Sequence, residues 1–230
     1  MKAVTDIDIQ LTPREMSRCQ TPGRDVSRQM MENFEKAVST ALSCAAPLIV
    51  YEFAEFKRMP NDKVFVVPVG RDQHFEVNMG TQADSLDGAE ILMIVAHSIG
   101  PELDARAKKL NDKGLYLESY LLDFAGLSAL NKVGIHGQKI AEAKAKQKGW
   151  GVSASLSPGS VDGWDVRDQK TLHCLLDLER YGISLTESCM LVPFKTVISV
   201  IGIGLGYKSK KVGSVCRLCS LRENCLQRRD

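Results

Sequence analysis

The 230-residue chain lacks a hydrophobic run long enough to cross a membrane. A membrane-spanning helix needs roughly 20 predominantly apolar residues. The nearest approach runs over residues 189–207, where Pro193 and Lys195 interrupt it. The N-terminus also has no apolar segment of the kind that directs secretion. We therefore predict a cytoplasmic protein with no membrane partner.

A large excess of charge of one sign is also missing. Thirty basic and 28 acidic residues leave a net charge of +2, which predicts no nucleic-acid partner for the molecule as a whole. Basic residues do gather near the C-terminus, where they form either a solvated tail or a docking surface for an acidic redox partner. A phosphate-binding Walker loop and the H-E-x-x-H and G-x-S-x-G motifs are absent, which argues against ATP-driven chemistry in this chain.

What the chain does have is cysteine, and three of its seven cysteines form the most informative motif. Cys216 and Cys219 form a C-x-x-C pair, which places two thiolates within reach of one metal or one iron of a cluster, and Cys225 can close around the same centre. Disulfides are not expected in a reducing compartment, so clustered cysteines are metal or redox candidates. Three thiolates are one short of a closed site. Either a remote residue completes it, or one position stays open.

The spacing favours an iron–sulfur cluster, of the [4Fe–4S] type, over zinc. Structural zinc sites commonly use two C-x-x-C knuckles, whereas this tail has one, and all four histidines are distant in sequence. A cluster tolerates uneven spacing and a remote fourth ligand. Cys189 is the best fourth-ligand candidate, with a buried strand cysteine as the alternative interpretation. Cys44 and Cys174 are predicted to be core residues, and Cys19 an exposed thiol.

Hydrophobic periodicity predicts a mixed α+β or α/β domain with a central sheet and flanking helices. It predicts helices over residues 24–44, from near 101, over 115–130, 135–145 and 168–181, and strands over 48–53, 64–68, 75–79 and 89–96. An irregular loop is expected over 151–163 and a strand hairpin over 189–206. The glycines at 202, 204 and 206 lie inside a strand and predict close backbone packing, not a dinucleotide site. We divide the chain into this domain, residues 1–207, and a metal-binding tail, residues 208–230.

One region resembles a known family. It contains Leu-Ser-Pro-Gly at 156–159, Trp164, Asp-Gln at 168–169, Leu-Leu-Asp at 175–177 and Leu-Thr-Glu-Ser-Cys-Met at 185–190. These residues resemble the reactivation domain of cobalamin-dependent methionine synthase, in particular its stand-alone members with a cysteine-rich C-terminus. The resemblance implies that fold, a corrinoid-binding or cobalamin-binding partner protein, and a ligand groove. In that groove the domain presents S-adenosylmethionine, with an incoming electron, to cobalamin in its Co(II) state. Pro158, Gly159, Thr186 and Glu187 are the cofactor-binding candidates.

The family's groove signature is incomplete here. An arginine, three intervening residues, a glycine and a tyrosine form it, and the chain keeps the glycine as Gly159. Ser155 stands where the arginine belongs, Ser160 where the tyrosine belongs, and Asn131 near the position of a glutamate on the preceding helix. Removing one charge-assisted contact costs only about 1.5–3 kcal/mol. The loss of three argues against S-adenosylmethionine binding.

We therefore expect an accessory redox protein of corrinoid metabolism, in which an iron–sulfur cluster on Cys216, Cys219, Cys225 and Cys189 delivers electrons for the reductive activation of a corrinoid protein. A zinc-clipped, non-redox binding module for a small molecule or a partner protein is one alternative. An S-adenosylmethionine-dependent reactivation domain is another, and the sequence also allows a homodimer. Lys195 is expected to be a solvated turn lysine and His97 a structural histidine.

Overall fold

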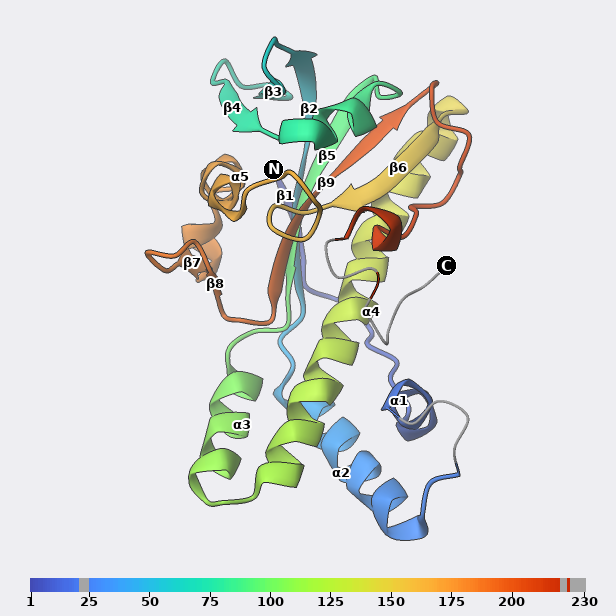
Figure 1. Ribbon diagram of the computed structural model, residues 1–230, viewed down its shortest axis with the longest axis vertical. Helices are drawn as coiled ribbons and strands as arrows, with labels where there is room; N and C mark the ends of the chain where they lie inside the picture. Colours follow the sequence, from blue (N-terminus) through green and yellow to red (C-terminus); the bar gives the residue numbers. More distant parts are fainter. Residues whose placement is uncertain (21–24, 220–222, 224–230) are drawn as a thin grey trace.

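A single antiparallel sheet organises the molecule (Figure 1). The computed structural model describes residues 1–20, 25–219 and 223. The seven strands follow the order β4-β3-β2-β5-β9-β6, and β1 pairs with β2 beside β3. Their bounds are β1 Lys2–Val4, β2 Leu48–Arg58, β3 Lys63–Pro68, β4 Phe75–Asn78, β5 Ile91–Ser98, β6 Gly151–Leu156 and β9 Thr196–Gly204. Two short strands, β7 Ser184–Leu185 and β8 Leu191–Val192, pair separately.

Strand β5 is buried on both sides, as its uninterrupted apolar sequence predicts. Successive side chains of a strand point to opposite faces, so β5 contributes to two cores. Met93 and Val95 belong to one cluster of buried residues, which we call the helix-side core. Leu92 and Ile94 belong to the other, the loop-side core. The predicted central sheet with flanking helices is confirmed.

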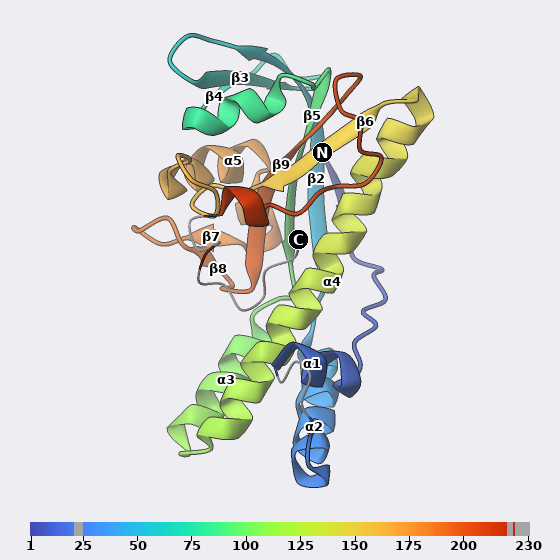
Figure 2. The same cartoon turned by 45° about the vertical axis from the view of Figure 1, so that its right-hand side comes forward.

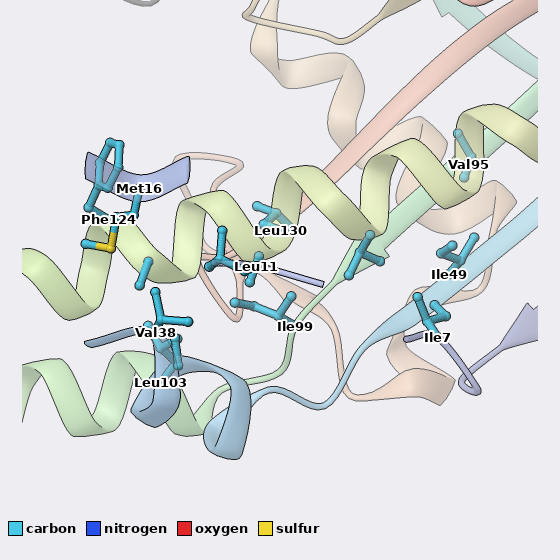
Figure 3. Close-up of a cluster of buried hydrophobic side chains, with 14 of the residues drawn as sticks. Ile7, Leu11, Met16, Val38, Ile49, Val95, Ile99, Leu103, Phe124 and Leu130 are labelled. Atoms are coloured by element: carbon cyan, nitrogen blue, oxygen red, sulfur yellow. The ribbon is translucent and has the colours of Figure 1, made fainter. Parts of the chain in front are cut away.

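The helices on the side of the first face are α1 Pro13–Gln20, α2 Arg28–Cys44, α3 Glu102–Asp112 and α4 Tyr116–Lys148. The long helix α4 lies along the first face, and the other three helices pack around its N-terminal part beyond the end of the sheet (Figure 2). The 33-residue helix α4 contacts β2, β5, β6 and β9. Apolar side chains from the N-terminal segment, from the helices and from the sheet meet in the helix-side core (Figure 3).

The prediction of two consecutive helices in the middle of the chain is wrong, because α4 is continuous. Glycines inside a helix disfavour it by about 1 kcal/mol each, yet here Gly134 lets the helix approach the sheet. A Cβ on Gly134 would lie 2.8 Å from Nε2 of His97, which is too close, whereas one on Gly137 would make an ordinary contact of 3.4 Å with Cγ2 of Val95. Tertiary packing therefore outweighs local propensity.

The second face is covered by short elements: η1 Gly80–Leu86, η2 Val166–Asp168, α5 Gln169–Leu175 and η3 Leu178–Tyr181. The single helix predicted over residues 168–181 is divided, because Asp177 adopts a left-handed conformation with φ of 45°. Gly182, with φ of 71°, ends the second part as expected.

Two further expectations about strands are corrected. Residues 151–156 form strand β6 and not an irregular loop, so the loop begins only at residue 157. The predicted hairpin over residues 189–206 does not form, since β8 pairs with β7 while β9 lies between β5 and β6. Because β9 is apolar on both sides, long-range pairing with β5 and β6 determines its position. The local turn at Pro193 does not indicate these partners.

The predicted close packing of the three glycines is confirmed, but only Gly202 and Gly204 lie inside β9, since the strand ends at Gly204 and Gly206 follows it in a turn. A Cβ on Gly202 would lie 2.3 Å from Oη of Tyr207. One on Gly204 would lie 2.3 Å from the carbonyl oxygen of Gly88, and one on Gly206 would lie 2.4 Å from Cα of that residue. In the described part of the chain, no helix has the length and hydropathy needed to span a bilayer.

Candidate functional site

The candidate site is built around the loop of residues 157–165, which follows β6. Gly159 adopts φ of 77° and its N–H donates to the carbonyl of Trp164 at 2.9 Å. The loop lies directly on η1, since a Cβ on Gly80 would lie 1.9 Å from the carbonyl oxygen of Gly163. The Gln82 amide also donates to the carbonyl of Asp162 at 2.7 Å. Close backbone contact and one side-chain hydrogen bond thus fix the loop.

Trp164 anchors the loop in the loop-side core. Its side chain is buried, and its indole N–H donates to Oδ2 of Asp168 at 2.9 Å. Burial raises the pKa of Asp168, and the hydrogen bond from Trp164 opposes part of that rise. A half-buried carboxyl group therefore lies three residues after the loop.

The cysteine turn, η4 Cys216–Leu218, is fastened onto this same loop (Figure 2). Asp162 donates its backbone N–H to the carbonyl of Leu218 at 2.9 Å. Leu218 and Val215 pack against the loop-side core. The segment leading to the turn runs along β6, where Val152 donates to the carbonyl of Ser209 at 2.9 Å and Ala154 forms a bridge with Gly213. Cys216 and Cys219 are half-buried at the two ends of the turn.

Cys189 lies in the loop between β7 and β8. The backbone N–H of Cys189 donates to the carbonyl of Thr186, and the N–H of Thr186 donates to that of Met190, both at 2.9 Å. Thr186 and Glu187 are exposed. Cys189 adopts φ of 61°, a left-handed conformation that is uncommon for residues other than glycine. A half-buried cysteine thus occupies a backbone conformation that glycine would adopt with less strain.

Cys189 contributes to the electrostatics of Arg167, which follows the 157–165 loop. The pKa of Arg167 is raised, chiefly by its hydrogen bonds to Asp165, with a smaller electrostatic contribution from Cys189. Within residues 1–20, 25–219 and 223, no group of three or more His, Cys, Asp or Glu side chains is placed to hold a metal ion. Cys189, Cys216 and Cys219 therefore do not form such a group, and Cys225 lies outside the described residues. The four-cysteine ligand set stays a prediction.

Comparison with known proteins identifies the fold. No family model matches the chain, and no curated protein matches its sequence. The crystal structure of the MetH reactivation domain bound to AdoHcy does match, with a TM-score of 0.57 over 94% of this chain and 82% of that chain. This chain has the fold of a MetH reactivation domain. The identity is 12%, so the likeness concerns the fold, and AdoHcy is the ligand of the solved protein.

In this reactivation-domain fold, the three departures from the family's groove signature are all uncharged. Ser155 lies in β6 opposite Ile201. Ser160 is exposed and donates its N–H to the carbonyl of Ser157 at 3.1 Å. Asn131 is exposed on α4. Pro158 is buried beside the exposed Gly159. None of the side chains of Ser155, Ser160 and Asn131 carries a charge or an aromatic ring.

The expectation that Lys195 is a solvated turn lysine is wrong. Its side chain is 5% exposed, and Nζ lies 2.6 Å from Oδ1 of Asp104 in α3 and 2.5 Å from Oδ1 of Asp123 in α4. Burial alone would lower the pKa of Lys195, but the hydrogen bonds to the two carboxylates outweigh it and raise the pKa. Phe194 also donates its N–H to Asp104 at 3.2 Å. The segment after the Cys189 loop is thereby tied to the reactivation-domain fold's helical side.

Other titratable residues are placed as follows. Cys174 is exposed on α5, so its prediction as a core residue is wrong: it falls on the solvent side of a short helix that buries Leu172 and Leu175. Cys44 packs against the helix-side core and Cys19 is exposed, as expected. Burial lowers the pKa of His97 to about 4, so this histidine is neutral at pH 7 and fits a structural role.

Proposed function

We propose that this protein delivers single electrons for the reductive activation of a corrinoid protein, through an iron–sulfur cluster held by its C-terminal cysteines. The observation that carries the proposal is the hydrogen bond from Asp162 to Leu218, together with the packing of Leu218 on the loop-side core. It holds the cysteine turn on the loop that contains Gly159, the remaining member of the groove signature. The corrinoid partner is supported by the match to the MetH reactivation domain.

The donor set fits such a cluster in its chemistry. Cys216 and Cys219 present two thiols from one short turn, and soft thiolate ligands select iron–sulfur clusters or zinc over hard cations. Cys225 would supply a third thiolate, and Cys189 would complete the set when its loop meets the tail. If these cysteines hold a cluster, it would supply one electron at a time: its one-electron oxidation would balance the reduction of Co(II) to Co(I), and a reduced low-potential carrier protein would return the electron.

The test begins with anaerobic purification, iron and sulfide analysis, and electron paramagnetic resonance of the reduced protein. We expect iron and sulfide in the wild type and their loss in Cys216→Ser and Cys219→Ser. The Cys174→Ser variant is the matched control, because Cys174 is exposed and far along the chain from the tail. Stoichiometric zinc without iron would contradict electron delivery and would favour the zinc-clipped binding module.

The role of Cys189 is tested by Cys189→Gly. Glycine adopts a positive φ without strain, so this variant should be as stable as the wild type or more stable. If Cys189 is a ligand, the variant nevertheless loses or alters the resonance signal of the cluster. A full cluster with an unchanged signal in Cys189→Gly would remove Cys189 from the ligand set.

The solved structure bound to AdoHcy supports a second candidate, S-adenosylmethionine-dependent reactivation. Ser155, Ser160 and Asn131 argue against it, since none of them carries a charge that could form an ion pair with that ligand. Calorimetric titration with S-adenosylmethionine should therefore show no binding. Tight binding would restore this second candidate.

A further inference from the structure

The end of α4 and the segment after β9 together carry a net positive charge. Residues 143–151 and 204–219 contain six lysines and Arg217 but no acidic residue. Because the whole chain carries +2 and these two segments carry +7, the remaining residues carry a net charge of −5. The two segments thus carry an excess of positive charge, while the rest of the chain is net negative.

The structure places the two segments side by side (Figure 1). The Lys210 ammonium donates to the carbonyls of Gly149 and Trp150, at 2.9 and 3.0 Å, just beyond the end of α4. Five exposed lysines form what we call the lysine surface: Lys146, Lys148, Lys208, Lys210 and Lys211. Among the described residues, none of these five takes part in an ion pair.

Helix capping accounts for only part of this surface. Lys146 and Lys148 lie in the last turn of α4, where a positive charge is favoured by the helix dipole, and Lys210 bonds to the carbonyls there. Lys208 and Lys211 have no such role. The carboxylate of Glu142, which accepts the N–H of Val212 at 3.0 Å, offsets part of the charge. The lysine charges in excess of it repel one another and lower stability, so their presence points to an anionic partner.

We propose that the lysine surface docks an acidic electron-carrier protein that reduces the cysteine-tail cluster. This inference rests on the proposed function, whose cluster it supplies with electrons. The surface is continuous with the cysteine turn: Lys211 and Cys216 are five residues apart, at most about 18 Å along an extended chain. Complementary charge would therefore bring a negatively charged carrier to the cysteines, raise the association rate and fix its orientation.

The surface fits a protein better than a nucleic acid. Leu205, which begins the same segment, is 70% exposed and provides an apolar contact beside the lysines. Base stacking needs an exposed aromatic face, whereas Trp150 is half-buried with the Lys148 ammonium 4.9 Å from its ring centroid. Six of the seven basic residues in the two segments are lysines, whereas bidentate phosphate recognition is characteristic of arginine.

The test uses the full chain and an acidic plant-type ferredoxin as the probe. Binding is measured by calorimetry at low salt, about 50 mM, where charge pairing is least screened. The double variant Lys208→Glu/Lys211→Glu should weaken binding by at least about tenfold. The matched control, Lys109→Glu/Lys113→Glu on and just after α3, changes the net charge equally and should leave the affinity within about twofold.

The affinity of the wild type should also fall as salt rises, and the cluster reduction rate should follow the affinity across the variants. Equal weakening by both double variants, or no ferredoxin binding to a cluster-loaded protein, would overturn the docking surface alone. Lysine-dependent ferredoxin binding to a protein without iron would support the surface while the proposed function fails. Binding of duplex DNA or of phosphatidylserine vesicles that needs Lys208 and Lys211, without ferredoxin binding, would also overturn it.

Discussion

The two faces of the central sheet are built differently. On the helix side, the long helix α4 lies close to the sheet at Gly134. On the loop side, the cover consists of 3-10 turns, the seven-residue helix α5, the 157–165 loop and the cysteine turn. Both faces bury a hydrophobic core. Long helices cover the helix-side core, whereas the loop-side core is covered by short elements, which backbone hydrogen bonds and anchors such as Trp164 and Leu218 hold in place.

The candidate functional residues lie on the loop side of the sheet. Gly159 lies in the loop after β6, Thr186 and Cys189 lie in the β7–β8 loop, and Cys216 lies in the turn that packs on the loop-side core. Loops on a rigid scaffold commonly carry function, since they can vary without loss of the core. We infer that the helix side sets the global stability and that the loop side sets the position of the site.

The largest expected effect tests the helix side through Lys195→Met. The change leaves Asp104 and Asp123 without their shared cation, and removal of one partner from a buried pair costs about 3–5 kcal/mol. Because the Asp123 side chain is 51% exposed, we expect a loss of roughly 2–4 kcal/mol in the free energy of unfolding, measured in urea. The control Lys132→Met removes the more exposed pair with Glu15 and should cost less than about 1 kcal/mol.

The destabilisation caused by Lys195→Met should depend on pH. The pKa of Lys195 is raised in the folded protein, so its contribution is complete below the unfolded pKa of about 10.4 and is lost as the pH rises through the folded value. The stability difference between wild type and Lys195→Met should therefore be constant near neutral pH and shrink in strongly alkaline urea titrations. A difference that shrinks on acidification to pH 6 would show that another group is responsible.

A smaller effect is expected where the tail leaves the sheet. The Tyr207 hydroxyl donates to the carbonyl of Ser85 at 2.8 Å, and burial raises the pKa of Tyr207 to about 12. In Gly202→Ala the new methyl would meet that hydroxyl, which should cost about 1–3 kcal/mol. Tyr207→Phe alone should cost about 1 kcal/mol through the lost hydrogen bond.

The double variant decides whether the clash is real. Without the hydroxyl, the nearest ring atom lies 3.0 Å from the added Cβ, so Gly202→Ala/Tyr207→Phe should cost less than the sum of the single changes. Gly137→Ala on the helix side, where the methyl meets Val95 at an ordinary 3.4 Å, is the control and should not destabilise the protein. Additive costs in urea unfolding would mean that Tyr207 does not fill the space above Gly202.

The sequence predicted what depends on local pattern. Strand β5 is recognisable because it is apolar on both faces, and the resemblance predicted the fold that the MetH structure confirms. The local pattern did not predict that α4 is continuous, because Gly134, a glycine inside it, faces His97 on a distant strand. The sequence around Gly134 does not indicate this contact. Lys195 finds its partners 91 and 72 residues away, and no local pattern marks such a pair.

The candidate site divides in the same way. The C-x-x-C spacing at Cys216 and Cys219 is a local signal and was readable. That the turn lies on the 157–165 loop was not, since it depends on a backbone hydrogen bond between Asp162 and Leu218, which no side-chain pattern announces. The exposed position of Cys174 likewise follows from how α5 packs on the sheet, and not from its apolar neighbours in sequence.

The smallest expected effect on stability tests the loop side through Leu218→Ala. The chain has two tryptophans, so in a Trp150→Phe background the fluorescence reports Trp164 alone. Truncation of the half-buried Leu218 should lower the free energy of unfolding by only about 1 kcal/mol yet make Trp164 measurably more accessible to acrylamide quenching. Leu205→Ala is the control, because Leu205 lies in the same segment but is 70% exposed, and it should change neither quantity. If Leu218→Ala destabilised the protein as much as Lys195→Met, the two faces would share one cooperative core, and the cysteine turn would be part of it.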